Sequence, residues 1–122
     1  MSIKPLKWLP DVQDSNYLAA ASYLTLLLPA SGVESLVAKL KAASLSEFKA
    51  KDIFRASGLS LLGISNSHVE KDRQKIKAGT PLSPILLVRS GQYSKVIVAD
   101  GYHRLCAVYG VDEDAWIPCK IV

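Results

Sequence analysis

The sequence predicts an α/β (α+β) domain, in which a small mixed sheet with flanking helices is preceded by an N-terminal helical hairpin. Two apolar runs rich in Val and Ile, at residues 84–88 and 95–99, are bounded by turn residues, which is typical of short strands. A third apolar run closes the chain at residues 116–122. Apolar residues at helical spacing fill much of the first third of the chain and recur between the candidate strands.

Length and composition fit one globular domain. The chain has 122 residues, of which 49% are apolar and 21% charged, and its formal charge is +4. We expect a single domain over residues 1–122, with residues 1–45 as a helical extension and residues 46–122 as the core. The basic excess favours anionic ligands and leaves DNA as an alternative partner.

The most apolar stretch has the features of neither a membrane span nor a secretion signal. Residues 17–28 are fewer than the about 20 residues that cross a bilayer. Asp11 and Asp14 precede them, which is unlike a signal peptide, so we expect a cytoplasmic protein without a membrane partner. Cys106 and Cys119 lie in apolar stretches and are expected to be buried, reduced thiols, and no metal-ligand spacing occurs.

Two helices are predicted at the start of the chain. Residues 15–28 form the first, which ends before Pro29. Its apolar residues lie nearly all round the helix, so we expect it to be buried in the domain or in a homodimer interface. Ser31 and Glu34 have the spacing of a capping box at the start of the second helix. The buried face of the second helix is expected to combine four apolar residues: Val33, Leu36, Val37 and Leu40.

The two helices and their short connection also resemble a DNA-binding helix-turn-helix. A recognition helix presents several side chains that read base edges. The second helix offers only Ser35, Lys39 and Lys41 on its outer side. We therefore favour a helical hairpin that packs on the sheet.

The middle of the chain predicts a strand, a loop and a helix. Residues 46–54 read as a short strand that runs into a turn, and residues 55–65 read as a loop. A helix is predicted over residues 67–78, with Gly79 as its C-terminal stop. Two residues form its predicted capping box: Ser67 and Glu70.

The last part of the chain predicts a strand, a helix and a strand. The strand over residues 95–99 breaks at an Asp-Gly pair, and residues 102–109 are predicted to form a helix that ends at Gly110. An acidic loop leads to the last strand, in which Pro118 indicates an edge position or a bulge.

The order of these elements resembles the ParB/sulfiredoxin superfamily. Its members share a Pro-Ile strand after a helix that ends in Gly, then a strand that runs into Gly-x-x-Arg at a helix start, and finally an Ile-Pro strand. This chain has the same motifs in the same order: Gly79, Pro84-Ile85, Gly101 to Arg104, and Ile117-Pro118. The resemblance covers about residues 48–122, well over half of the chain, and leaves the N-terminal hairpin outside it.

The resemblance implies a nucleotide-binding protein. The superfamily includes ParB proteins, which bind and hydrolyse CTP, and sulfiredoxins, which use ATP. A free-serine kinase branch carries Asp-Gly-x-His-Arg, the nearest match to residues 100–104. The implied ligand is a nucleoside triphosphate or diphosphate (ATP, CTP or ADP), with or without Mg²⁺. The implied activity is nucleotide hydrolysis or phosphoryl transfer, with nuclease activity claimed for other members, and fold alone does not select among them.

The Asp-Gly-Tyr-His-Arg corner also has the chemistry of an anion site. Gly101 lets the chain turn sharply, and the new helix exposes backbone N–H groups and the positive end of its dipole. His103 and Arg104 lie in the first turn, where cations are unfavourable unless an anion is bound. The alternative for Arg104 is an ion pair with the acidic loop: Asp112, Glu113 or Asp114.

Asp100 and His103 are the candidate catalytic residues of this corner. Asp100 is either a general base or a ligand of nucleotide-bound Mg²⁺. The alternative is that its side chain caps the helix, because Asp is a preferred N-cap residue.

A second basic surface is predicted on the helix over residues 67–78. Its His68, Lys71 and Lys75 share one face, and the corresponding helix of sulfiredoxins contacts the nucleotide. The alternative is a solvated face that nearby acidic residues balance: Glu70 and Asp72. Arg55 resembles the arginine that follows the first strand of ParB domains. The predicted nucleotide-binding residues are therefore Gly101, Tyr102, His103, Arg104, His68, Lys71, Lys75 and Arg55.

Two departures limit the resemblance. Tyr102 stands where sulfiredoxins carry their catalytic cysteine, and Cys106 lies one turn further on, so the chain is not expected to be a sulfiredoxin. The kinase branch uses a glutamate near the first strand, where this chain has only Glu47 and Asp52.

From the resemblance and the chemistry of the corner together, we predict a nucleotide-binding protein. The alternative is a non-enzymatic regulatory or interaction module, as a dimer or bound to DNA, in which the phosphate site is a relic.

Overall fold

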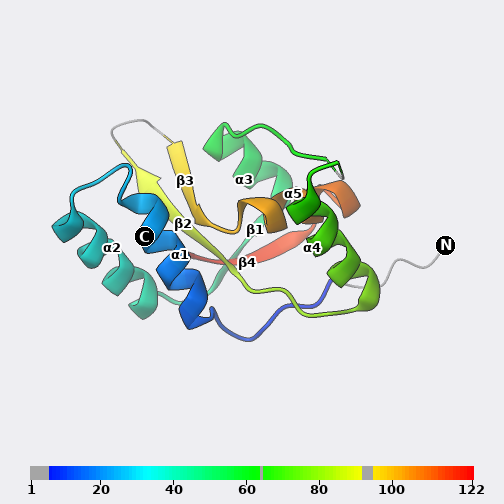
Figure 1. Ribbon diagram of the computed structural model, residues 1–122, viewed down its shortest axis with the longest axis horizontal. Helices are drawn as coiled ribbons and strands as arrows, with labels where there is room; N and C mark the ends of the chain where they lie inside the picture. Colours follow the sequence, from blue (N-terminus) through cyan, green and yellow to red (C-terminus); the bar gives the residue numbers. More distant parts are fainter. Residues whose placement is uncertain (1–5, 64, 92–94) are drawn as a thin grey trace.

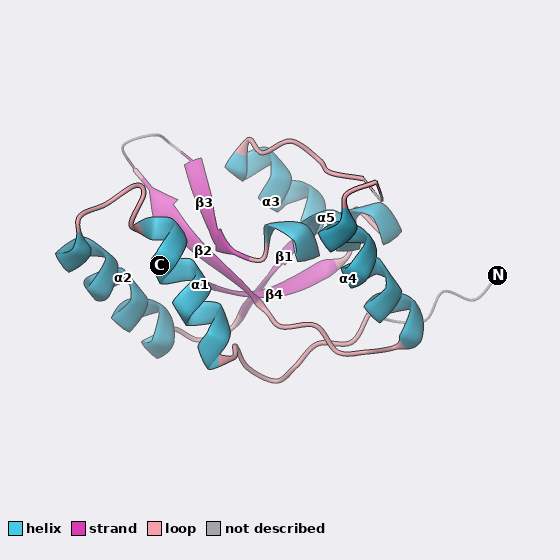
Figure 2. Cartoon of the chain, viewed as in Figure 1, coloured by secondary structure: helices cyan, strands magenta, loops and turns pink. Residues whose placement is uncertain are grey.

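The structure is a computed structural model that describes residues 6–63, 65–91 and 95–122 (Figure 1). Helices precede a four-stranded sheet and also alternate with its strands, which confirms the predicted α+β class (Figure 2). The elements follow the chain in this order: α1 (Asp14–Leu24), α2 (Ala30–Ala42), β1 (Ser46–Lys49), α3 (Ala50–Ser57), α4 (Ser67–Ala78), β2 (Ile85–Ser90), β3 (Lys95–Asp100), α5 (Tyr102–Val111) and β4 (Trp116–Ile121).

The sheet is mixed and has the strand order β1-β4-β2-β3. β1 pairs antiparallel with β4, β4 pairs parallel with β2, and β2 pairs antiparallel with β3. β4 is therefore an inner strand, and the prediction that Pro118 marks an edge strand is wrong. Pro118 lies opposite Glu47 of β1, and the pairing with β2 begins only at Cys119, so proline precedes the parallel ladder.

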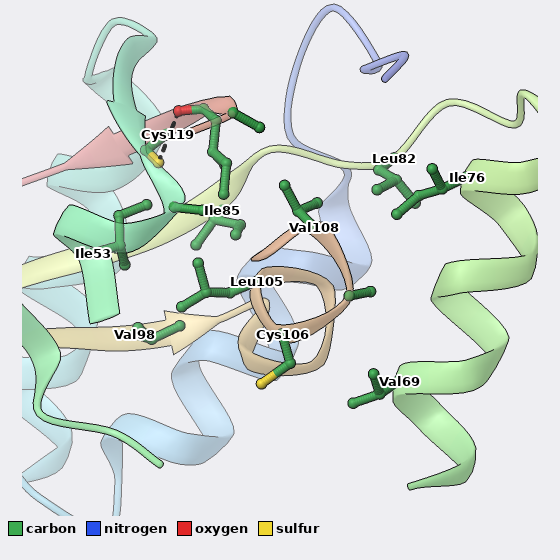
Figure 3. Close-up of a cluster of buried hydrophobic side chains, with 14 of the residues drawn as sticks. Ile53, Val69, Ile76, Leu82, Ile85, Val98, Leu105, Cys106, Val108 and Cys119 are labelled. Atoms are coloured by element: carbon green, nitrogen blue, oxygen red, sulfur yellow. Dashed lines mark hydrogen bonds between the residues drawn. The ribbon is translucent and has the colours of Figure 1, made fainter. Parts of the chain in front are cut away.

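Helices cover both faces of the sheet. α1 and α2 lie on one face, where Leu24 packs in a cluster with Leu86 of β2. α3, α4 and α5 lie on the other face, where Leu105 of α5 lies between Ile85 and Val98 (Figure 3). Because both faces of β2 are covered, the first four residues of this strand are all buried. This explains the unbroken apolar run in the sequence.

The helical hairpin differs from its prediction at two boundaries. α1 ends at Leu24, because the chain then tightens into a turn in which the N–H groups of Leu26 and Leu27 bond to carbonyls three residues back. α2 has Pro29 as its N-cap, so Ser31 lies inside the first turn and the predicted capping box is wrong. The predicted buried face of α2 is confirmed, with two buried and two half-buried side chains: Val33, Leu40, Leu36 and Val37.

α1 is buried on one side only, although its sequence is apolar nearly all round. Tyr17, Ala20 and Leu24 are buried against the sheet. Leu18 on the outer side is 73% exposed, and Leu26 in the following turn is 81% exposed. Burial within the domain, one of the two predicted alternatives, is therefore only partial, and burial in a homodimer interface stays a prediction.

A helix follows β1 in place of the predicted turn and loop. β1 has only four residues, so the predicted strand over residues 46–54 and the loop at the start of residues 55–65 are wrong. Ala50 and Ile53 are buried on one face of α3, and Gly58 ends the helix with a φ of +67°. Apolar residues in this stretch fit both a two-residue period and a helical period, and packing against β3 and α5 selects the helix.

α4 has the predicted bounds but a different cap. Oδ1 of Asn66 accepts a hydrogen bond from the His68 N–H at 3.0 Å, so Asn66 and not Ser67 is the N-cap. The predicted capping box with Glu70 is therefore wrong. Gly79 ends the helix with a φ of +76°, as predicted.

The C-terminal elements lie close to their predicted bounds. α5 continues through Gly110 to Val111 before it ends. Cys106 and Cys119 are unpaired and buried, as predicted, and burial raises the pKa of Cys119 to about 12. None of the helices in the described ranges is long and apolar enough to cross a membrane.

Candidate functional site

β3 and α5 meet at Gly101, which turns the chain with a φ of +109°. L-amino acids rarely adopt this backbone conformation. A Cβ atom at this position would also lie 2.8 Å from Cγ1 of Ile85 and 3.0 Å from Nη2 of Arg104. The predicted sharp turn is present, and both backbone and packing require glycine there.

Asp100 ends β3, and its carboxylate binds Arg104. A register shift in the pairing of β3 with β2 leaves Ala99 without an opposite partner just before Asp100. Oδ2 of Asp100 accepts a hydrogen bond from Nη2 of Arg104 at 3.0 Å, and the carboxylate side chain is only 14% exposed. Asp100 does not cap α5, because Gly101 occupies the N-cap position.

The N-terminus of α5 has no side-chain cap among the described residues. The backbone N–H of Leu105 bonds to the carbonyl of Gly101 at 2.8 Å, which closes the first turn of the helix. The N–H groups ahead of Leu105 have no acceptor within the helix. These groups carry the positive end of the helix dipole.

Arg104 binds within the corner and does not reach the acidic loop. Nη2 of Arg104 also donates to the carbonyl oxygen of Pro84 at 3.3 Å. Its Nε is buried and has no hydrogen-bond partner among the described residues. Asp114 of the acidic loop pairs instead with Lys51 at 2.6 Å. The alternative of an ion pair between Arg104 and this loop is therefore wrong.

α4 and the start of α5 enclose a cavity of about 180 Å³. The rings of His68 and His103 lie 4.8 Å apart between centroids, so the first turns of the two helices meet at this cavity. Its lining comes from both helices and the corner: His68, Lys71, Asp72, Lys75, Asp100, Gly101, Tyr102, His103 and Arg104. The structure thus brings together every predicted site residue except Arg55.

Arg55 lies outside the cavity. It is in the last turn of α3, its side chain is 82% exposed, and its Nη1 lies 3.7 Å from the carboxylate of Asp52. The prediction of Arg55 as a phosphate ligand assumed a strand followed by a loop, and the helix α3 places it elsewhere. Neither Asp52 nor Glu47 lines the cavity.

The cavity has a positive charge that its own carboxylates do not balance. Lys75 lies 3.9 Å from Asp72, whereas Lys71 forms no ion pair with any described residue. Glu70 does not pair with Lys71, because its carboxylate lies 3.7 Å from Nη1 of Arg73 and also accepts a hydrogen bond from Gln74 at 2.6 Å. With Arg104 bound to Asp100, Lys71 and the uncapped helix end are the groups left to attract an anion.

Tyr102 and Cys106 hold the loop that follows α3. The hydroxyl of Tyr102 donates a hydrogen bond to the carbonyl of Ser60, and Sγ of Cys106 accepts one from the Leu62 N–H at 3.5 Å. Burial raises the pKa of both side chains above their usual values. Tyr102 also lines the cavity, whereas Cys106 does not.

Asp72 is a cavity residue that the sequence analysis treated only as a balancing charge. It lies four residues after His68 and three before Lys75, so helical spacing places it on their face. The cavity therefore holds two carboxylates, those of Asp72 and Asp100. Mg²⁺ in nucleotide sites is usually bound by one or two carboxylates together with the phosphates. The described residues contain no group of three or more metal-ligating side chains, so an ion held by these carboxylates would depend on the phosphates for its other ligands.

Comparison with known proteins adds no family to this description. No family model, no curated protein and no solved structure matches the chain.

Proposed function

We propose that the cavity between α4 and α5 binds the phosphate groups of a nucleoside triphosphate or diphosphate. The observation that carries the proposal is the uncapped N-terminus of α5 at a cavity lined by Lys71 and Lys75. Backbone N–H groups, a helix dipole and lysine ammonium groups are together suited to phosphate. The resemblance of this corner to the ParB/sulfiredoxin superfamily supports the same ligand class.

The proposed function is nucleotide binding, and catalysis is a further step that is tested separately. A hydrolase or phosphotransferase would use Asp100 or His103 as the proton acceptor, or Asp100 as a ligand of Mg²⁺. Arg104 forms an ion pair with the carboxylate of Asp100 and so orients it, and the ring of His103 lies 4.8 Å from that of His68 at the same cavity. ATP turnover in the binding samples, followed as released phosphate, tests the catalytic step directly.

Replacing Lys71 with alanine is expected to weaken nucleotide binding about tenfold or more. Lys71 has no ion pair with a described residue, so its ammonium group is available to the phosphate. A hydrogen bond to a charged group contributes roughly 1.5–3 kcal/mol, which corresponds to this change in Kd. Calorimetric titration with ATP, CTP and ADP, each with and without Mg²⁺, measures the effect.

Lys77→Ala is the matched control for this experiment. Lys77 lies on the same helix and is exposed, but it does not line the cavity. Its removal changes the net charge equally and is expected to leave Kd within twofold. If both variants weakened binding equally, the effect would come from the net charge of the protein and not from a contact of Lys71 with the phosphate. If no nucleotide and no inorganic phosphate gave binding heat, the proposal would be refuted.

A second candidate function is self-association through the N-terminal hairpin. The large exposure of Leu18 and Leu26 favours it, because apolar side chains of this size on one helix and its turn are suited to contact with a second copy. Such a dimer would make the protein an interaction module that needs no turnover.

The double variant Leu18→Lys and Leu26→Lys is expected to be monomeric if the wild type is a dimer. Both side chains face solvent, so the change adds charge to the outer surface and leaves the core unchanged. Sedimentation equilibrium measures the mass, and Ser35→Lys on the exposed side of α2 is the control. A monomeric wild type at high concentration would remove this candidate.

A further inference from the structure

A second cavity, of about 420 Å³, adjoins the phosphate cavity. The two share three charged residues in their walls: Asp72, Lys75 and Arg104. A molecule bound in one cavity would therefore lie against the same charged wall as a molecule bound in the other. Arg104 belongs to this shared wall, and its Nε is buried and has no hydrogen-bond partner among the described residues.

The N-terminal segment of the chain closes the second cavity. This segment is held beside the chain that follows α4, since the Leu9 N–H donates to the carbonyl of Leu82 at 2.8 Å. The Leu82 N–H donates in turn to the carbonyl of Lys7 at 2.9 Å. Leu9, Gln13 and the buried Asn16 thereby line this cavity together with residues 80–83. The segment lies outside the part of the chain that resembles the ParB/sulfiredoxin superfamily.

The wall formed by these segments is polar but uncharged. Ser83 Oγ donates to Oε1 of Gln13 at 3.0 Å, and Oδ1 of Asn16 accepts from the Gln13 N–H at 3.0 Å. These bonds orient both amides and leave their nitrogen donors without a hydrogen-bond partner among the described residues. The Thr80 hydroxyl makes no hydrogen bond to a described residue either. Amide and hydroxyl groups of this kind match the donors and acceptors of a ligand's hydroxyl groups.

We infer that the second cavity binds the hydroxyl-bearing carbon skeleton of a small molecule whose phosphate occupies the first cavity. The inference rests on the proposed function, because it assigns the phosphate to the shared charged wall. Two sources supply this chemistry: the sugar of the phosphorylated ligand itself, or a separate alcohol bound beside the phosphate. The cavity is larger than the phosphate cavity, and its volume lies in the range of small-molecule sites.

Ribose 5-phosphate and inorganic phosphate are the probes that test this inference. The wild type is expected to bind ribose 5-phosphate at least tenfold more tightly than inorganic phosphate, measured by calorimetry. Thr80 lines the second cavity and is exposed, so Thr80→Tyr adds a bulky ring to the cavity without disturbing the core. It is expected to abolish this preference and to keep the Kd for inorganic phosphate within twofold.

Ser35→Tyr, on the exposed side of α2 and outside both cavities, is the matched control and should keep the preference. A separate alcohol is tested by adding ribose to the phosphate-saturated protein and following the backbone amide signals of Thr80 and Gln13 by NMR. Saturable shifts that Thr80→Tyr removes would support the inference with that source.

Two results overturn the inference and can be told apart. If inorganic phosphate binds but ribose 5-phosphate is no tighter and ribose causes no shifts, the second cavity has no such ligand while the phosphate site stands. If no phosphate compound binds, the phosphate site and the inference fail together.

Discussion

Gly101→Ala is expected to lower the free energy of unfolding by roughly 2–4 kcal/mol. No other substitution that adds one methyl group at the site is expected to have so large an effect. Two costs add up at this position. A φ of +109° is rarely adopted by L-residues, and the new Cβ would lie 2.8 Å from Cγ1 of Ile85. Ile85 is fully buried in β2, so it has little room to move. Thermal or urea unfolding followed by circular dichroism measures the loss.

Gly110→Ala is the matched control, and its effect should have the opposite sign. Gly110 lies inside α5, and a Cβ atom there would meet no atom within 4 Å. Alanine at a helical position is favoured over glycine by roughly 0.5–1 kcal/mol. If Gly101→Ala were as stable as the wild type, the corner would not have the conformation described, and the geometry of the phosphate site would have to be revised.

Arg104→Ala is expected to lower the free energy of unfolding by about 2–3 kcal/mol and also to weaken nucleotide binding. The change leaves the carboxylate of Asp100, which is 14% exposed, without its guanidinium partner. It also removes the donor to the carbonyl of Pro84. The structure therefore gives Arg104 a part in stability as well as in the charge of the cavity.

A double-mutant cycle measures how much the ion pair contributes to stability. Asp100→Ala, Arg104→Ala and the double variant are expected to show a coupling of about 1–2 kcal/mol, because the side chains are in contact and mostly buried. The exposed pair of Asp52 and Arg55 is the control, and its coupling should be below about 0.5 kcal/mol. Equal coupling in the two cycles would mean that the pair at the corner does not stabilise the fold.

The binding experiment on the same variants asks a different question. Because Asp100 carries a negative charge in the cavity, its removal alone should strengthen phosphate binding if no Mg²⁺ is needed. If binding requires Mg²⁺, removal of Asp100 should weaken it in the presence of the ion. The sign of the change in Kd therefore shows whether the carboxylate of Asp100 repels the phosphate or binds its Mg²⁺.

Local sequence signals determined the C-terminal end of α4 and the position of the corner. Gly79 and Gly101 occupy left-handed conformations that other residues disfavour, so their positions could be predicted without knowledge of any partner. The helical spacing of His68, Lys71 and Lys75 likewise put them on one face before any contact was known. The buried part of strand β2 was equally clear, since helices on both faces demand apolar residues at its first four positions.

Contacts between segments far apart in the chain decided the rest. Apolar spacing in residues 50–57 was compatible with strand or helix, and packing on β3 and α5 selected the helix that removes Arg55 from the site. Pro118 suggested an edge strand, yet β1 and β2 flank β4 on both sides.

The partners of Asp100 and Arg104 also depended on the tertiary structure. From the sequence, Asp100 could cap α5, because Asp is a preferred N-cap residue. Arg104 could likewise bind the acidic loop, because that loop follows a few residues later in the chain. The turn at Gly101 instead brings the side chains of Asp100 and Arg104 together, and Asp114 forms its ion pair with Lys51. The second cavity had no sequence signal at all, because its walls join residues 9–16 with residues 80–83. The sequence by itself thus determined the turn at Gly101 and the helix that starts there. Only the folded chain decided which groups surround this corner, because those groups come from segments that meet only through packing.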